Sequence, residues 1–432
     1  MARRRWLVTA CAVLAFAQTM AYYVYLRDDP GNYNGAGAQG DQVAYIALGQ
    51  QVLHGTWDGA VHYMPGLPAV IALSQLVFGD PRFGIAVVQA LLYALLVVGG
   101  SLLARRAFGD PTAVPAAAVI GLNPALGYYA AQALTEFLTG VVLFGVVVVT
   151  FAWSQRPRMG GILALGVLIG LASYLRSEYL GLAVVFALLV AVVGRSVRQA
   201  GVLLVVVVVA MAPWVVRYAV ATGQPALYNE SPFSNLVLMG TWFRVFDEQT
   251  FGQLQQIETA PGPREQAIER ASSVGPRPEL SRRYMEQARG PYERPLGETA
   301  QLAVDNIRLN LRQYLTNHLL LAPVLIWAGH TPIRQADAPS LPSSARYAIW
   351  AAELGLLLLA LWQCAVALRD RRTRTLALSF LLIILFITAV HVVIAVDERF
   401  TTPALPLIGV FAGARLGLLV RARQRLTVGY AG

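Results

Sequence analysis

Apolar runs long enough to cross a lipid bilayer recur along the chain, and turn residues or charges bound each of them. A membrane-spanning helix needs about 20 predominantly apolar residues. The pattern therefore predicts an all-α, polytopic membrane helical bundle with about ten transmembrane helices. These helices are expected at residues 6–26, 81–104, 112–132, 136–154, 160–175, 178–194, 200–221, 346–368, 375–396 and 400–420.

The placement of arginine predicts the orientation of these helices. Cytoplasmic loops of membrane proteins carry an excess of basic residues. If the ten helices alternate, all arginine clusters reach one side of the membrane, which makes both termini cytoplasmic. The clusters are Arg3–Arg5, Arg105 and Arg106, Arg156 and Arg158, Arg195 and Arg198, Arg369–Arg374, and Arg421–Arg425.

Residues 311–327 are apolar enough to form a further span, but counting them as one would move the cluster at 369–374 to the outer side. We therefore expect this segment to be a helix that lies along the outer membrane surface. The expected organisation has three parts. Residues 1–221 form a transmembrane module that includes an outer loop at 27–80, residues 222–345 form an extracytoplasmic insert, and residues 346–432 form the C-terminal transmembrane helices. The outer-face loops carry juxtamembrane helices.

Composition agrees with a membrane protein. Of the 432 residues, 56% are hydrophobic and only 13% are charged. A soluble protein could not bury so much apolar surface. The formal charge of +10 comes from arginine, because the sequence contains no lysine, and it does not indicate a nucleic-acid partner. The two cysteines, Cys11 and Cys364, both lie in apolar segments, which argues against a disulfide framework or a metal–thiolate cluster.

Several ionisable residues interrupt the apolar runs. An ionised side chain costs roughly 2.5–3.5 kcal/mol at the middle of a membrane, so such residues are rare and mark functional sites. The ionisable residues in question are Glu136, Arg176, Glu178, Arg217 and the run Asp397–Arg399. If the helices alternate as above, all of these residues reach the outer leaflet, as do Asp41 and Tyr63. Guanidinium groups bind phosphate oxygens in pairs, so arginines beside an exposed carboxylate suit a lipid-phosphate substrate and a proton-accepting step.

Structural roles compete with these assignments. Asp41 follows Gly40 and is equally suited to cap the N-terminus of the next helix. Arg176 and Glu178 could pair only with each other. The run from Asp397 to Arg399 has the composition of a solvated turn. The histidines lack the spacing of metal ligands, so no metal ligand is assigned.

The order of short motifs resembles that of a known superfamily. Asp41 is followed four residues later by Tyr45 and the helix IALGQQVLHG, and then by YMPGLP at residues 63–68. Further motifs follow in the same order: AAQALTE ending at Glu136, GLASYLRSEYLG around Arg176, PWVVRYAVATG around Arg217, and ERFTTPALPLIG from Glu398. This series resembles the GT-C superfamily of integral-membrane glycosyltransferases. The match is closest to the branch of the lipid A aminoarabinose and galacturonic acid transferases and the protein O-mannosyltransferases.

The chain departs from the superfamily pattern at three positions. Gln42 stands where a second carboxylate is frequent, and Met64 stands where some relatives have a lysine for the lipid phosphate. Tyr218 follows Arg217 where asparagine is usual. These changes bear on metal dependence and on phosphate binding.

The resemblance implies an inverting transferase in a bacterial plasma membrane, with its active site on the extracytoplasmic side. It would move a sugar from a polyprenyl-phosphate donor to a hydroxyl group of a lipid, glycan or protein acceptor, with Asp41 as the general base. The resemblance assigns donor phosphate binding to Arg399, Arg217 and Arg176. It places Tyr45, Tyr63, Glu136, Glu178 and Glu398 in the sugar or acceptor pocket. It assigns no cofactor with certainty and leaves a divalent metal open.

Two other functions fit the same residues. A transporter or flippase of lipid-linked sugars would also need arginines and an outer-leaflet cavity. The polar residues gather on one side of the bilayer, whereas a carrier needs a site near the midplane that both sides can reach. The second is a non-catalytic scaffold of an envelope complex.

Overall fold

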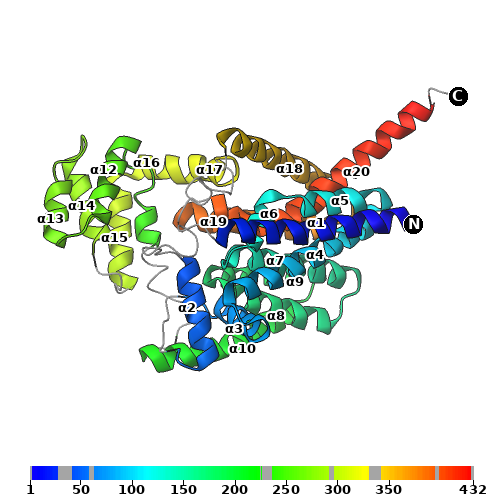
Figure 1. Ribbon diagram of the computed structural model, residues 1–432, viewed down its shortest axis with the longest axis horizontal. Coiled ribbons are helices and arrows are strands. Elements are labelled where there is room, and N and C mark those ends of the chain that lie inside the picture. The colour runs from blue at the N-terminus through cyan, green and yellow to red at the C-terminus, as the bar shows by residue number, and fades with distance from the viewer. Residues whose placement is uncertain are drawn as a thin grey trace. The chain divides into compact units, whose positions relative to one another are not determined.

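Every regular element in the described part of the computed structural model is a helix (Figure 1). The structure describes residues 2–27, 41–57, 63–223, 225, 236–290, 296–329, 342–394 and 398–429. The chain forms two compact units. Unit 1 comprises Met1–Tyr228, His330–Ile387 and Glu398–Gly432, and unit 2 comprises Asn229–Gly329 and Thr388–Asp397.

Eight helices within the described ranges are long and apolar enough to cross a membrane, which confirms a polytopic membrane protein with an all-α fold. Two shorter apolar helices, Gly66–Phe78 and Met159–Leu175, accompany them. The eight candidate spans are Ala2–Arg27, Pro81–Phe108, Thr135–Gln155, Ser177–Gly194, Val197–Thr222, Ser343–Arg369, Arg374–Val393 and Arg399–Arg425.

The segment 112–132, predicted as one span, is instead broken. It contains α5 (Ala113–Gly121) and α6 (Pro124–Ala130), after a short 3-10 helix, η2 (Asp110–Thr112). Asn123 starts the second helix, because its side chain accepts a hydrogen bond from the amide of Leu126 at 2.9 Å and a proline follows it. The hydroxyl group of Tyr93 donates to the carbonyl groups of Ile120 and Asn123, at 2.6 and 3.1 Å, and so satisfies carbonyls at the break.

Unit 1 is a bundle in which small residues allow close helix crossings (Figure 1). A Cβ atom on Gly413 would lie 2.4 Å from the Cα atom of Ala116, and one on Gly417 would lie 2.4 Å from the carbonyl oxygen of Pro111. The last long helix therefore packs closely against α5 and η2. The helices of this bundle are α1 (Ala2–Arg27), α4 (Pro81–Phe108), α7 (Thr135–Gln155), α8 (Met159–Leu175), α9 (Leu182–Gly194), α10 (Val197–Thr222), α18 (Ser343–Arg369), α19 (Arg374–Ile394) and α20 (Leu405–Gly429).

Several arginine clusters meet at one end of this bundle. Arg4 forms an ion pair with Asp110 at 3.0 Å, and the guanidinium group of Arg372 donates to the carbonyl group of Arg106 at 3.0 Å. Gln155, at the C-terminus of α7, donates to the carbonyl group of Arg372 at 3.0 Å. Glu136 lies at the opposite end of α7. The basic clusters and this acidic residue are therefore one helix length apart.

Short elements at the Glu136 end of unit 1 carry most of the motifs. They are α2 (Asp41–His54), α3 (Gly66–Phe78), and the 3-10 helices η3 (Ser177–Gly181) and η5 (Glu398–Ala404). Helix α2 packs on α3, where a Cβ atom on Gly49 would lie 2.5 Å from Ile71. Helix η5 packs on the start of α7.

Unit 2 is a separate helical assembly around an aromatic core, with Trp242, Leu254, Tyr284 and Met285 among its buried residues. Side chains of Gln287 and Asn306 form a buried hydrogen-bond network with Thr241 and the indole of Trp242. The elements of unit 2 are α12 (Glu248–Thr259), α13 (Arg264–Ala271), α14 (Pro278–Ala288), α15 (Leu296–Leu309), α16 (Leu311–Leu315), the π-helix η4 (Thr316–Leu321), α17 (Ala322–Ala328) and the last turns of α19.

Candidate active site

Asp41 is an accessible carboxylate held by side chains from two distant parts of unit 1. It is the first residue of α2, and its side chain is 42% exposed. The hydroxyl group of Tyr63 donates to Oδ1 at 3.3 Å, and Nη1 of Arg399 lies 3.4 Å from Oδ2. A position at a helix N-terminus also favours a negative charge. The carboxylate is therefore oriented and open to a substrate.

Tyr45 lies one helical turn after Asp41 and is buried. Its ring meets that of Tyr63 edge-on, with the ring centroids 4.8 Å apart. Burial raises the pKa of Tyr45 well above its ordinary value, so its phenol stays protonated at neutral pH. The spacing of four residues predicted from the sequence thus places Tyr45 behind the tyrosine that binds Asp41.

Glu136 is a second carboxylate with a different environment. It lies in the first turn of α7, and only 3% of its side chain is exposed. Its Oε1 atom is 3.3 Å from Nη1 of Arg176 and 3.6 Å from Nε of Arg399. A buried charge is tolerated when it is paired, and here one carboxylate pairs with two guanidinium groups.

Arg176 completes a chain of alternating charges. It lies in extended backbone between α8 and η3, and its Nε atom donates to Glu178. Three carboxylates and two guanidinium groups thus alternate in the order Asp41, Arg399, Glu136, Arg176 and Glu178. The pairing of Arg176 with Glu178, expected as a structural alternative, is present together with the contact to Glu136.

Phe400 supports both guanidinium groups, and the sequence motifs did not single it out. The Cζ atoms of Arg176 and Arg399 lie 4.8 and 5.1 Å from the centre of its ring. Cations over an aromatic face are attracted to the ring and lose less free energy when they leave water. The available signal was the aromatic residue directly after Arg399.

Two of the sequence-predicted site residues are not placed in this chain of charges. Arg217 lies over the ring of Trp57, with its Cζ atom 3.8 Å from the ring centre, and Nη2 donates to the carbonyl group of Trp57 at 3.4 Å. The side chain of Glu398 lies outside the described residues, as does the whole of Asp397. The roles of Arg217 and Glu398 stay predictions.

A buried amide network connects α2 to the segment that precedes Glu136. Gln42 Nε2 donates to Oε1 of Gln132 at 3.1 Å, and Gln42 Oε1 accepts from the amide of Ala133 at 3.3 Å. Gln89 Nε2 in turn donates to the carbonyl group of Gln132 at 2.7 Å. A carboxylate at position 42 could not make the donating bond while ionised. The departure of Gln42 from the superfamily pattern therefore has a structural role beside Asp41.

The YMPGLP motif brings α3 against the backbone that precedes Arg176. A Cβ atom on Gly66 would lie 2.6 Å from the carbonyl oxygen of Tyr174. Only glycine allows this approach, so the motif holds Tyr63 and Arg176 in one region of unit 1. Among the described residues, no group of three or more histidine, cysteine, aspartate or glutamate side chains is arranged to bind a metal ion.

A family model described as dolichyl-phosphate-mannose-protein mannosyltransferase matches residues 62–217. This range contains Tyr63, Glu136, Arg176, Glu178 and Arg217 and excludes Asp41 and Arg399. Among curated proteins, none matches the sequence significantly.

Several solved structures match this chain. The archaeal oligosaccharyltransferase AglB from Archaeoglobus fulgidus, in complex with an inhibitory peptide and a dolichol-phosphate, matches with a TM-score of 0.54 and 14% identity. That match covers 98% of this chain and 52% of AglB. A structure of the Archaeoglobus fulgidus oligosaccharyltransferase with Zn and sulfate matches with a TM-score of 0.51 and 15% identity, over 98% of this chain and 50% of that one. ArnT from Cupriavidus metallidurans, in the apo state, matches with a TM-score of 0.38 and 19% identity, over 95% of this chain and 78% of ArnT.

The chain spans about half the length of the archaeal structures. At these identities the archaeal structures establish the fold, and the family model adds a match in sequence over the middle of unit 1. Both findings agree with the resemblance indicated by the ordered motifs: the chain is similar in sequence to a mannosyltransferase family over residues 62–217 and similar in fold to an archaeal oligosaccharyltransferase.

Proposed function

We propose that this protein transfers a sugar from a polyprenyl-phosphate donor to an acceptor hydroxyl group, with inversion at the anomeric carbon and with Asp41 as general base. The observation that carries the proposal is the contact of an accessible carboxylate, Asp41, with an arginine, Arg399, which a buried glutamate holds from behind. The family match and the dolichol-phosphate bound to AglB support the class of donor.

In the proposed reaction, the acceptor oxygen attacks the anomeric carbon and its proton passes to Asp41. The bond between that carbon and the phosphate oxygen breaks, and polyprenyl phosphate leaves with the bonding electrons. Attack from the face opposite the phosphate inverts the configuration. A positioned base of this kind contributes about 10²–10⁴-fold in rate.

Arg399 is the first choice for the donor phosphate. Its guanidinium group lies within 3.6 Å of both Asp41 and Glu136, and its planar set of N–H donors matches the oxygens of a phosphate group. The donor phosphate and the Asp41 carboxylate are both anions, so they compete for Arg399. Binding of the phosphate frees the carboxylate to accept a proton. Inversion places this base and the leaving phosphate on opposite faces of the sugar. Glu136 keeps Arg399 in place during this exchange.

Transfer is tested by incubating the purified protein in lipid nanodiscs with a labelled polyprenyl-phosphate sugar and a cell-envelope fraction as acceptor. We expect release of polyprenyl phosphate and a product of inverted configuration. Asp41→Asn should lower release about 10²-fold or more while the protein still inserts and folds. Arg399→Ala should chiefly weaken use of the donor lipid, which is seen as a higher KM for the donor.

Other outcomes would contradict the proposal. Near-normal turnover of the Asp41→Asn variant would remove Asp41 from the mechanism. An unchanged donor dependence in Arg399→Ala would move the phosphate site to Arg176 or Arg217. Movement of the intact donor across the bilayer without bond cleavage would indicate a flippase.

We further propose an extracytoplasmic active site in a bacterial plasma membrane, because the arginine clusters gather at the opposite end of the bundle.

A further inference from the structure

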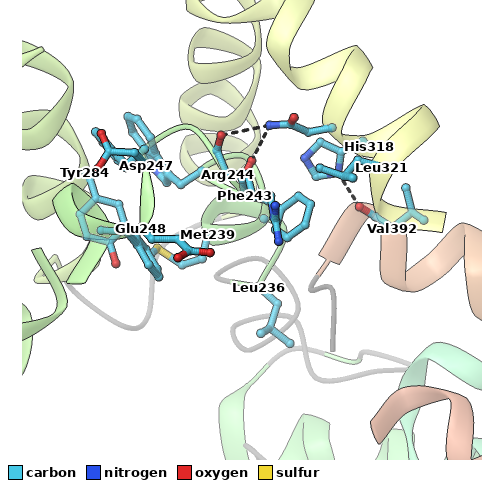
Figure 2. Close-up of a pocket in the computed structure, with 15 residues that line it drawn as sticks. Leu236, Met239, Phe243, Arg244, Asp247, Glu248, Tyr284, His318, Leu321 and Val392 are labelled. Atoms are coloured by element: carbon cyan, nitrogen blue, oxygen red, sulfur yellow. Dashed lines mark hydrogen bonds between the residues drawn. The ribbon is translucent and has the colours of Figure 1, made fainter. Parts of the chain in front are cut away.

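Unit 2 contains a cavity of about 700 Å³ that belongs wholly to this unit (Figure 2). Small-molecule sites typically have about 300–1,000 Å³. Residues 236–251, Tyr284, the π-helix η4 and Val392 form its wall. The charged chain around Asp41 belongs to unit 1 and contributes no residue to it.

The polar tips of Trp242 and Tyr284, two aromatic wall residues, are engaged by residues that do not line the cavity. The indole nitrogen of Trp242 donates to Gln287 at 2.7 Å, and the hydroxyl group of Tyr284 donates to Glu258 at 2.6 Å. Neither acceptor lines the cavity. The rings therefore present carbon to the interior, together with Phe243 and other apolar side chains.

The amide group of Asn317 and the Nδ1 atom of His318, both in η4, are engaged by backbone carbonyl groups of the wall. Asn317 donates to the carbonyl groups of Phe243 and Arg244, at 2.9 and 3.3 Å. His318 contacts the carbonyl oxygen of Val392 through Nδ1, and Figure 2 shows these three interactions as dashed lines. A sugar would need several unengaged hydrogen-bonding groups. Apart from Nε2 of His318, which is buried without a hydrogen-bond partner among the described residues, this wall offers mostly carbon.

Charged side chains occur only at the exposed edge of the described wall. Arg244, Asp247 and Glu248 are all exposed. The carboxylate of Asp247 accepts bonds from the amide and hydroxyl groups of Thr250, at 2.8 and 2.9 Å, and so caps α12. An apolar interior with a charged edge fits an amphiphile whose chain is buried and whose head stays in water.

The helical segment from α16 to α17 has two different faces. Asn317, His318 and Leu321 line the cavity. The opposite face exposes Leu315, Leu319, Leu320 and Val324 to between 43% and 70%. A helix with such an apolar face is suited to lie in the surface of a bilayer, as the sequence predicts for residues 311–327. One wall of the cavity is therefore the helix expected to touch membrane lipid.

We propose that unit 2 binds the hydrocarbon chain of a membrane lipid, which enters from the leaflet that the segment 311–328 contacts. The chain occupies the apolar interior, and the charged edge at Arg244, Asp247 and Glu248 faces the head group. This binding does not depend on sugar transfer. If the proposed transfer also holds, the site favours a lipid acceptor over a polysaccharide or a protein.

The test uses the full-length protein in nanodiscs whose phospholipid carries a diazirine at the end of one acyl chain. After irradiation, mass spectrometry maps the labelled peptides. We expect label on residues 236–251, inside the wall, as well as on the transmembrane helices. Leu321→Trp fills the cavity and should reduce label on residues 236–251 about tenfold. Leu320→Trp, on the neighbouring exposed position, is the matched control and should leave that label unchanged.

A second filling variant, Met239→Trp, approaches the cavity from another segment and gives an independent result if Leu321→Trp fails to fold. Asp41→Asn should label like the parent protein, which separates this proposal from that of transfer. Label confined to the transmembrane helices and to Leu315, Leu319, Leu320 and Val324 would overturn the proposal. Equal label on residues 236–251 in the parent protein and both filling variants would also overturn it.

Discussion

At the scale of single residues, two carboxylates share one arginine but differ in exposure. Asp41 is 42% exposed, whereas Glu136 is 3% exposed, and Arg399 lies within 3.6 Å of both. An exposed ion pair contributes about 0–1 kcal/mol to stability, while removal of one partner from a buried pair costs about 3–5 kcal/mol. Asp41 is thus free to take part in chemistry, and Glu136 is committed to holding the arginines.

This difference in exposure predicts that two alanine substitutions lower stability by different amounts. Glu136→Ala leaves Arg176 and Arg399 without their shared carboxylate and should lower the free energy of unfolding by about 3–5 kcal/mol. Asp41→Ala should change it by about 1 kcal/mol or less and still abolish transfer. Thermal unfolding of both variants in the same nanodiscs measures this difference. Equal losses of stability would show that the Glu136 pairings are no stronger than a surface ion pair.

At the scale of elements, two contacts set the position of the helices that carry the site. The buried amides of Gln42, Gln132 and Gln89 connect α2 to the segment before α7 and to α4. Gly66 brings the start of α3 against the backbone at Tyr174. Gln42 positions α2, whose Asp41 contacts Arg399, and Gly66 positions α3 against the backbone that precedes Arg176. Displacements of about 1 Å far from the reacting atoms can lower rates about 10²-fold.

Gln42→Ala should therefore lower kcat about 10²-fold with a smaller change in the KM for the donor, because Asp41 loses its position and Arg399 keeps its support from Glu136. Gln50→Ala is the matched control, since Gln50 lies on the same helix with its side chain exposed. Steady-state kinetics with varied donor concentration distinguish the two constants. A change in KM alone would show that Gln42 acts on donor binding.

Gly66→Ala should destabilise the protein by about 1–3 kcal/mol, because the added Cβ atom would meet backbone atoms of Tyr174 and Leu175 that cannot rotate away. Gly160→Ala is the control, since a Cβ atom on Gly160 meets nothing within 4 Å. Thermal unfolding compares the two variants, and transfer assays show whether Arg176 has shifted. Wild-type stability in Gly66→Ala would mean that α3 can move without cost.

At the scale of the whole molecule, the catalytic candidates and the basic clusters lie at opposite ends of α7, within unit 1. This helix has 21 residues, and a rise of 1.5 Å per residue gives a length of about 30 Å. That length matches the hydrocarbon thickness of a bilayer, also about 30 Å. The chain of charges around Asp41 and the arginine clusters are therefore suited to opposite membrane surfaces.

Cysteine accessibility in intact cells tests this orientation. In a variant without Cys11 and Cys364, Gln50→Cys should react with a membrane-impermeant maleimide added outside. Arg371→Cys should react only after permeabilisation, because basic loops stay in the cytoplasm. The activity of both variants shows that the label reports on folded protein. The reverse pattern of labelling would place the site on the cytoplasmic side.

Hydropathy and motif order were sufficient to predict the membrane class and the helical fold. Apolar runs and arginine bias are local properties, so they can be read along the chain without knowledge of packing. The break at Asn123 escaped this pattern. The composition is apolar on both sides of the break. The group that bonds to the backbone carbonyls at the break is the hydroxyl of Tyr93, which lies on another helix.

The partners of each charge depended on the packing of helices far apart in the chain. Asp41 and Arg399 are 358 residues apart, and Gln42 contacts a segment 90 residues away. The motifs named Asp41, Arg399 and Arg217 alike, yet Arg217 lies on Trp57. Likewise, the apolar segment 311–327 was visible in the sequence, but its cavity-lining face was not. Such contacts arise where helix surfaces complement one another in space, and the periodicity of a single helix carries no record of its neighbours.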